Sequence, residues 1–137
     1  MSILPNKPSD LISVALSDLR KVESDEWYAV RMGVWHEPQE RACAVCFAGA
    51  VMAMTLHVPI NTATNPDEFK WALRRKLRAL DAFRRGELYE AYSALGILRP
   101  PGIPHAVPIP DYGRYSEAFH AAMHGMADML EKAGDYR

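Results

Sequence analysis

The stretch Cys43-Ala-Val-Cys46-Phe-Ala-Gly-Ala-Val-Met-Ala-Met-Thr-Leu56 decides the expected fold. It contains two cysteines, several small residues and larger apolar residues, and it carries no charge. A helix that is apolar around its whole circumference is buried on all sides in a protein of ordinary polarity. We therefore predict a central buried helix from about residue 40 to residue 57, which Pro59 ends.

Length and composition indicate one globular domain over residues 1–137, with residues 1–8 as a flexible arm. Hydrophobic residues make up 49% of the chain and charged residues 24%, which is a globular composition. Two cysteines are too few for a disulfide framework, the N-terminus lacks an apolar signal core, and no apolar run reaches the roughly 20 residues of a membrane span. We expect a cytoplasmic protein in a reducing compartment, with no membrane association.

Four further helices are predicted from apolar residues that recur at helical spacing. They run from Ser9 or Asp10 to Ser24, from Asn65 to Arg85, from Glu87 to Leu95, and from Ser116 to Gly134. Ser9 or Asp10 is expected to cap the first of them and Ser116 the last. The start Asn65-Pro-Asp-Glu combines a cap residue, a proline at the first helical position and acids near the positive end of the helix dipole. Five prolines in residues 98–111 predict a loop.

Residues 27–35 change the period of the pattern. Aromatic and branched residues alternate there with smaller or charged ones, which predicts a short strand that ends at His36-Glu-Pro. Its partner strand cannot be identified from the pattern. The expected fold is mainly α, with about five helices around the buried central helix and a minor extended or β element near residues 27–35.

Cys43 and Cys46 have the spacing of a redox pair or of half a metal site. His120 and His124, four residues apart on the last predicted helix, would complete a two-Cys, two-His zinc site across two helices. The gap between the pairs is far longer than in a compact zinc finger, and the β-α-β pattern of a thioredoxin-like protein is missing. We therefore favour buried structural cysteines and expect no cofactor, with zinc as the alternative.

A basic helix face is the second candidate site. Asp67 to Arg85 contains seven basic and three acidic residues, a balance of +4 in a chain of net charge −1. Trp71, Arg74, Arg75, Arg78 and Arg85 are expected on the exposed face of that helix. They would contact a partner protein, or bind nucleic-acid phosphates while the indole stacks on a base. The other interpretation is a solvated face that pairs with acidic residues elsewhere in the chain.

The segment Tyr28-Ala-Val-Arg-Met-Gly-Val-Trp-His36, followed by Cys-Ala-Val-Cys-Phe-Ala-Gly-Ala-Val-Met-Ala, resembles small uncharacterised proteins of tailed bacteriophages and prophages. The similarity covers residues 10–57 well and the rest loosely. It implies expression in a bacterial cytoplasm during infection or lysogeny, and it carries over no catalytic residue.

The chain shows no phosphate-binding glycine loop, no serine nucleophile motif and no carboxylate pair of glycosidase type. We therefore expect an accessory protein that is not an enzyme and that binds a host or phage protein. The alternative is a helical nucleic-acid-binding protein that uses the basic face of residues 70–85. A third hypothesis is a thiol- or zinc-dependent protein at Cys43 and Cys46.

Overall fold

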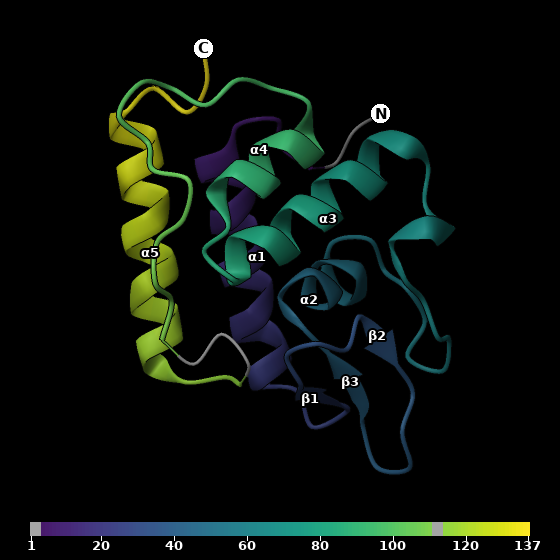
Figure 1. Cartoon of the computed structure of the whole chain (residues 1–137). Helices are drawn as coiled ribbons and strands as arrows, with labels where there is room; N and C mark the ends of the chain where they lie inside the picture. Colours follow the sequence, from purple (N-terminus) through teal and green to yellow (C-terminus); the bar gives the residue numbers. More distant parts are fainter. Residues whose placement is uncertain (1–3, 111–113) are drawn as a thin grey trace.

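The computed structural model describes residues 4–110 and 114–137 as helices gathered above a small three-stranded sheet (Figure 1). The helices are α1 (Pro8–Glu23), α2 (Phe47–Met54), α3 (Trp71–Arg84), α4 (Leu88–Leu95) and α5 (Glu117–Lys132), with a 3₁₀ turn η1 (Pro66–Glu68). The strands are β1 (Tyr28–Val30), β2 (His36–Glu37) and β3 (Cys43–Val45). The predicted fold class, mainly α with a minor β element, is confirmed.

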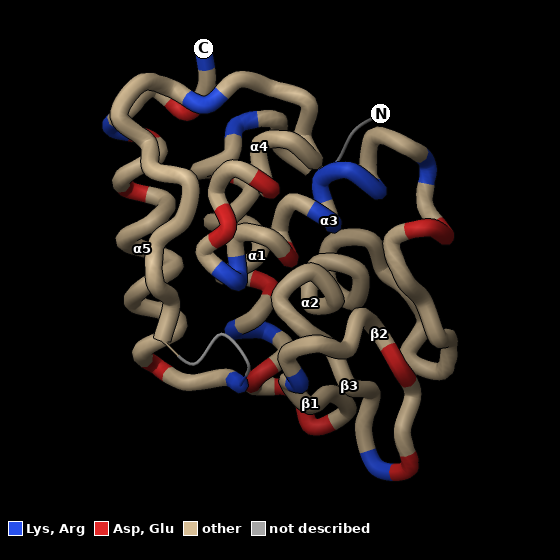
Figure 2. Tube along the Cα trace, in the orientation of Figure 1, with Lys and Arg blue, Asp and Glu red and all other residues tan. Residues whose placement is uncertain are grey.

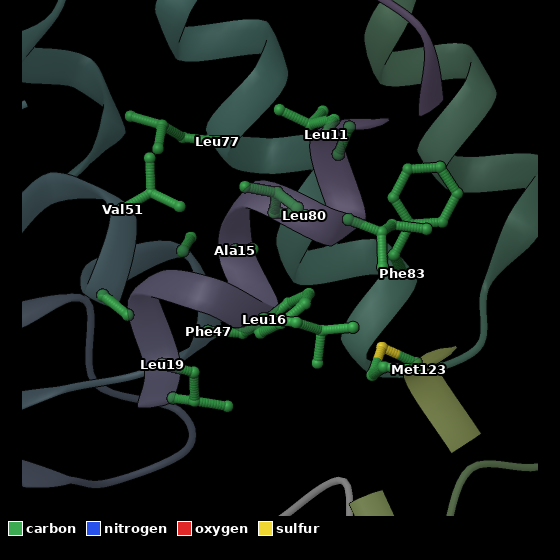
Figure 3. Packing of buried hydrophobic residues seen from close by; sticks show 14 of the residues in the cluster. Leu11, Ala15, Leu16, Leu19, Phe47, Val51, Leu77, Leu80, Phe83 and Met123 are labelled. Carbon is green, nitrogen blue, oxygen red and sulfur yellow. The ribbon is translucent and has the colours of Figure 1, made fainter. Parts of the chain in front are cut away.

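One apolar cluster joins the helices. Helix α1 packs against α2 and α5, while α3 packs against α4 and α2. Figure 3 shows the buried side chains of α1, α2, α3 and α5 turned toward one another; those labelled are Leu11, Ala15, Leu16, Leu19, Phe47, Val51, Leu77, Leu80, Phe83 and Met123. Full burial of one large apolar side chain stabilises the fold by about 1.5–3 kcal/mol, so this cluster is a main source of stability.

The central apolar segment is a strand followed by a helix, so the prediction of one helix over residues 40–57 is wrong in its first part. Cys43–Val45 forms β3, and Cys46 is the N-cap of α2, where its Sγ accepts a hydrogen bond from the Gly49 amide at 3.3 Å. A short apolar run reads alike as a buried strand or a buried helix, which is why periodicity misplaced the boundary. The predicted burial is confirmed for residues 43–53, whereas residues 54–56 are only partly buried, His57 is exposed, and the helix already ends at Met54.

Strand β3 is the partner strand of the extended segment near residues 27–35, which the sequence pattern could not identify. It pairs in parallel with β1, with Tyr28 opposite Cys43, and it pairs in antiparallel fashion with β2. The predicted strand over residues 27–35 therefore shrinks to β1 and a turn that contains Gly33 at φ +95°. The extended segment was also predicted to end at His36, but His36 instead begins β2.

The start of α1 is capped by the other end of the chain. Lys7 holds the N-cap position without a side-chain bond, so the prediction that Ser9 or Asp10 caps the helix is wrong. The amide and hydroxyl of Ser9 instead donate to the two carboxylate oxygens of Asp135, at 2.7 and 2.9 Å. Within the arm predicted over residues 1–8, Leu4 is buried, whereas Asn6 and Lys7 are exposed; residues 1–3 lie outside the described structure.

Helix α3 begins later than predicted. The Asn65 side chain accepts a hydrogen bond from the Asp67 amide at 2.8 Å, but this cap serves only the turn η1. Phe69 then takes an extended conformation with φ −106° and ψ 161°, and the helix starts at Trp71. Capping chemistry identified the turn correctly, whereas the extended residue after it could not be seen in the sequence.

The last two helices agree with prediction. Helix α4 ends at Gly96, which takes the left-handed conformation, and Ser116 caps α5 by accepting a hydrogen bond from the Phe119 amide at 3.2 Å. The proline-rich residues between them form a loop as far as they are described, and residues 111–113 lie outside that part.

Gly49 marks the closest backbone approach in the core, and its replacement tests the packing of α2. A Cβ there would lie 1.6 Å from the Trp35 carbonyl oxygen, which is backbone and cannot rotate away. We expect Gly49→Ala to lower the free energy of unfolding by roughly 3 kcal/mol, at the upper end of overpacking costs, in urea titrations followed by circular dichroism.

The matched control is Gly125→Ala in α5, where an added Cβ meets nothing within 4 Å. That change should raise the free energy of unfolding by about 0.5–1 kcal/mol, because alanine loses less backbone entropy in a helix. Equal effects of the two substitutions would contradict the close approach of α2 to Trp35.

Candidate partner-binding surface

The two cysteines occupy separate buried environments. The Cys43 Sγ lies 3.6 Å from Nδ1 and 3.7 Å from Nε2 of His36, and His36 Nδ1 is 2.8 Å from the Thr62 carbonyl oxygen. With the proton on Nδ1, the histidine donates to Thr62 and ties the loop after α2 to the sheet. From the sequence His36 could fold back toward the cysteines, but only the pairing of β2 with β3 places it beside Cys43.

Burial makes both thiols poor nucleophiles. Desolvation raises the pKa of Cys43, and it raises the pKa of Cys46 to about 11 although the Gly49 amide opposes the shift. Reactive cysteines have the opposite environment, because their thiolates are exposed and stabilised by nearby positive charge. The geometry thus favours structural cysteines over a redox pair.

The histidines of α5 lie in a different setting from the cysteines. The His120 ring is buried beside Tyr115, with ring centroids 5.2 Å apart, and the His124 ring is 6.3 Å away. Neither ring nitrogen of His120 has a hydrogen-bond partner in the described part of the chain. Nor does that part contain a group of three or more His, Cys, Asp or Glu side chains placed to bind a metal ion, so the predicted ligands Cys43, Cys46, His120 and His124 are not assembled.

Acidic neighbours neutralise much of the predicted basic face. Figure 2 shows blue basic positions along α3 with the red acidic turn η1 beside its start. Arg74 and Arg78 both reach the Asp67 carboxylate, at 3.8 and 2.6 Å. Arg85 pairs with Asp81 and with Glu90, at 3.4 and 3.0 Å. These arginines form a paired helix face and not a continuous cationic track.

An exposed apolar surface lies where the start of α3, the end of α4 and the C-terminal tail come together. We call it the Trp71 surface; its members are Trp71, Tyr89, Leu95, Ile97, Leu98 and Tyr136. The exposed fractions of Trp71 and Leu98 are 65% and 68%. Exposed apolar groups that gather in one place are typical of interaction sites, whereas scattered ones need no explanation. The sequence identified only Trp71 of this set.

The Arg75 guanidinium stacks on the Trp71 side chain. Its guanidinium carbon lies 4.2 Å from the indole ring, which is a cation–π contact, and its Nε donates to the Ala94 carbonyl at 2.8 Å. Gly96 makes room for this arrangement, because a Cβ there would lie 1.6 Å from Arg75 Nη2. Gly96 also has φ +70°, so the residue that ends α4 is glycine for two independent reasons.

The C-terminal tail contributes Tyr136 through two fixed contacts at the preceding residue. The Asp135 carboxylate accepts both hydrogen bonds from Ser9, and the Tyr92 hydroxyl donates to the Asp135 carbonyl. Since Asp135 is tied to α1 and α4, Tyr136 is held beside the hollow that Trp71 also lines. The tail is therefore part of the surface.

Two hollows lie in the Trp71 surface. One, of about 270 Å³, lies between Trp71, Ile97 and Tyr136, and the other, of about 310 Å³, lies between Tyr89, Ile97 and Leu98. They share Ile97 and are therefore adjacent. Small-molecule sites usually range from about 300 to 1,000 Å³; one hollow is below that range and the other is at its lower limit, so both suit inserted side chains better than a large cofactor.

A larger hollow of about 460 Å³ lies beside β1, between Tyr28, Arg31 and Tyr115. None of the large exposed apolar side chains lines it. It therefore lacks the feature that distinguishes the Trp71 surface.

No protein-family model matches the chain, and no curated protein or solved structure is significantly similar to it. None of the described helices has the length and apolar character that a membrane crossing requires. Its function must therefore be inferred from its own residues.

Both thiols should resist labelling in the native protein. We expect Ellman's reagent to react with Cys43 and with Cys46 at least about 100-fold more slowly than with a free thiol, because each side chain is buried and its pKa is raised. The control is the same protein in guanidinium, where both thiols should react at once. Fast labelling of one thiol under native conditions would revive the chemical hypothesis.

The free energy of unfolding should fall as the pH drops below the pKa of a free histidine. Burial lowers the pKa of His36, although its bond to Thr62 opposes this, and burial and Arg20 lower the pKa of His120. The unfolded chain, with histidine pKa values near 6.5, then takes up protons that the native state refuses. The free energy of unfolding should be highest above about pH 6.5 and fall below it by up to about 1.4 kcal/mol per pH unit for each histidine. Chemical denaturation between about pH 7.5 and 5.5 measures this slope.

The variant His36→Asn isolates the contribution of one histidine to the pH dependence of stability. Asparagine keeps an amide donor for the Thr62 carbonyl but takes up no proton, so the pH slope should be shallower than in the native sequence. His120→Asn should reduce the slope in the same way. Slopes unchanged in both variants would show that neither histidine carries the pH dependence.

Proposed function

We propose that this chain is a small accessory protein, not an enzyme, that binds another protein through the Trp71 surface. The observation that carries the proposal is the gathering of exposed apolar side chains around the two adjacent hollows. Exposed aromatic groups beside pockets are the usual anchors of protein interfaces, because they bury a large area at small entropic cost.

The phage or prophage origin rests on the resemblance of residues 10–57, and it makes a host or phage protein in the bacterial cytoplasm the expected partner. Nucleic-acid binding is the second candidate. The stacked pair of Trp71 and Arg75 favours it, while the ion pairs of Arg74, Arg78 and Arg85 weigh against it. A thiol or zinc function at Cys43 and Cys46 draws the least support, since both sulfurs are buried.

Site-specific photocrosslinking tests the proposal. A benzophenone amino acid at Leu98 reports on the Trp71 surface, and the same amino acid at Trp27 is the matched control, since Trp27 is 62% exposed. Trp27 directly precedes β1, which lies at the other end of the molecule from α4 and the C-terminus (Figure 1). We expect a discrete protein adduct in cells only from the Leu98 position, and its loss when Trp71→Ala is added.

No adduct from Leu98, or the same adduct from Trp27, would show that the Trp71 surface does not bind a partner. A nucleic-acid adduct from Leu98 that disappears on nuclease treatment would support the second candidate instead.

A further inference from the structure

The charges around the Trp71 surface have one sign. The smaller hollow is also lined by Arg75 and Lys76, and the larger by Arg99. None of the described residues that line either hollow is acidic. The surface therefore combines apolar anchoring sites with a rim of positive charge.

The arginines of this rim differ from the others on α3. Arg75 donates to the Ala94 carbonyl, and Arg99 donates to the Ile103 carbonyl at 3.0 Å while its guanidinium lies over Tyr89. Within the described structure neither forms an ion pair with a carboxylate. Backbone carbonyls orient these guanidinium groups but leave their positive charge without an acidic partner.

The area around the two hollows, which none of the described acidic side chains line, ends at Tyr89. Beyond Tyr89 lies another hollow, which is lined by Glu87, by Glu90 in its ion pair with Arg85, and by His105. A ligand that extends along the Trp71 surface therefore meets positive charge around Trp71 and Leu98, and negative charge past Tyr89. This change of sign along the surface sets the direction in which a charged ligand can lie.

We propose that the partner presents an acidic segment with large apolar side chains, which seats its apolar groups in the two hollows and its carboxylates against Arg75 and Arg99. This inference rests on the proposed function and specifies the chemistry of the partner. Apolar insertion supplies affinity, and charge complementarity selects an acidic segment over a basic one. The proximity of Glu87 further disfavours carboxylates at the Tyr89 end.

The observations favour a peptide over a nucleic acid as the ligand. Trp71, Tyr89 and Tyr136 each have a face on which a base could stack, but the other half of the surface, Leu95, Ile97 and Leu98, is aliphatic and suits inserted side chains. Few cations line the two hollows, whereas phosphate binding along a strand uses a longer series of them. A single-stranded oligonucleotide is therefore the competing probe in the test.

Selection from a random displayed peptide library on the intact protein tests the inference. We expect enriched peptides to carry Leu, Phe or Trp together with Asp or Glu. By fluorescence anisotropy, Trp71→Ala should abolish binding of a labelled selected peptide. Arg99→Glu should weaken it by about tenfold or more, because it reverses one charge at the rim and leaves every apolar member of the surface in place. The matched control Trp27→Ala should leave it unchanged, and circular dichroism checks that each variant is folded.

Enrichment of basic or uncharged peptides, no enrichment, or unaltered affinity in Arg99→Glu would overturn the inference. Tighter binding of an oligothymidine probe than of any selected peptide would overturn it in favour of nucleic acid. If Leu98 crosslinks to a protein while selected peptides show no acidic preference, the partner chemistry is wrong and the proposed function stands. If the Leu98 crosslink is also absent, the proposed function itself fails.

Discussion

The complete burial of the uncharged segment from Cys43 to Ala53 is the constraint on which the rest of the structure depends. Nothing in this segment can face water favourably, so other elements must cover it on every side. Strands β1 and β2 cover β3 at its two edges, and α1 and α3 cover α2. The small side chains let this happen at short range, and Gly49 lies against the Trp35 carbonyl because it has no Cβ. The cysteines serve the same end as small apolar groups.

The two ends of the chain meet on this core. Asp135 supplies the hydrogen-bond acceptors that the first turn of α1 lacks locally, and Tyr92 of α4 holds the same residue by its carbonyl. A capping interaction of this kind contributes about 1 kcal/mol to stability. Its larger consequence is positional, because it places Tyr136 beside Trp71. A contact that stabilises the fold thus also assembles the candidate binding surface.

The distribution of arginine partners separates structure from interaction on α3. Arg74, Arg78 and Arg85 face carboxylates, and such exposed pairs contribute little to stability but neutralise the face. Arg75, one position from Arg74, turns instead toward Ala94 and Trp71. Side-chain direction around the helix decides which cation is neutralised and which remains at a surface with exposed apolar groups. The overall charge of the helix, which the sequence shows at once, does not reveal this.

Sequence periodicity determined where the helices that lie on the surface of the core would form. A half-buried helix has an apolar stripe, and the spacing of that stripe can be read directly from the sequence. Residues 8–23, 71–84, 88–95 and 117–132 are of this kind, and composition alone showed that the segment after Cys46 would be buried. Tertiary structure alone decided the pairing of β1 with β3, the contact of His36 with Cys43, the capping of α1 by Asp135 and the gathering of Leu98 and Tyr136 around Trp71. The reason is physical. Most of these contacts join residues far apart in the chain, and His36 meets Cys43 only because β2 pairs with β3. A fully buried strand or a single exposed side chain also has no periodic pattern in the sequence by which it could be recognised.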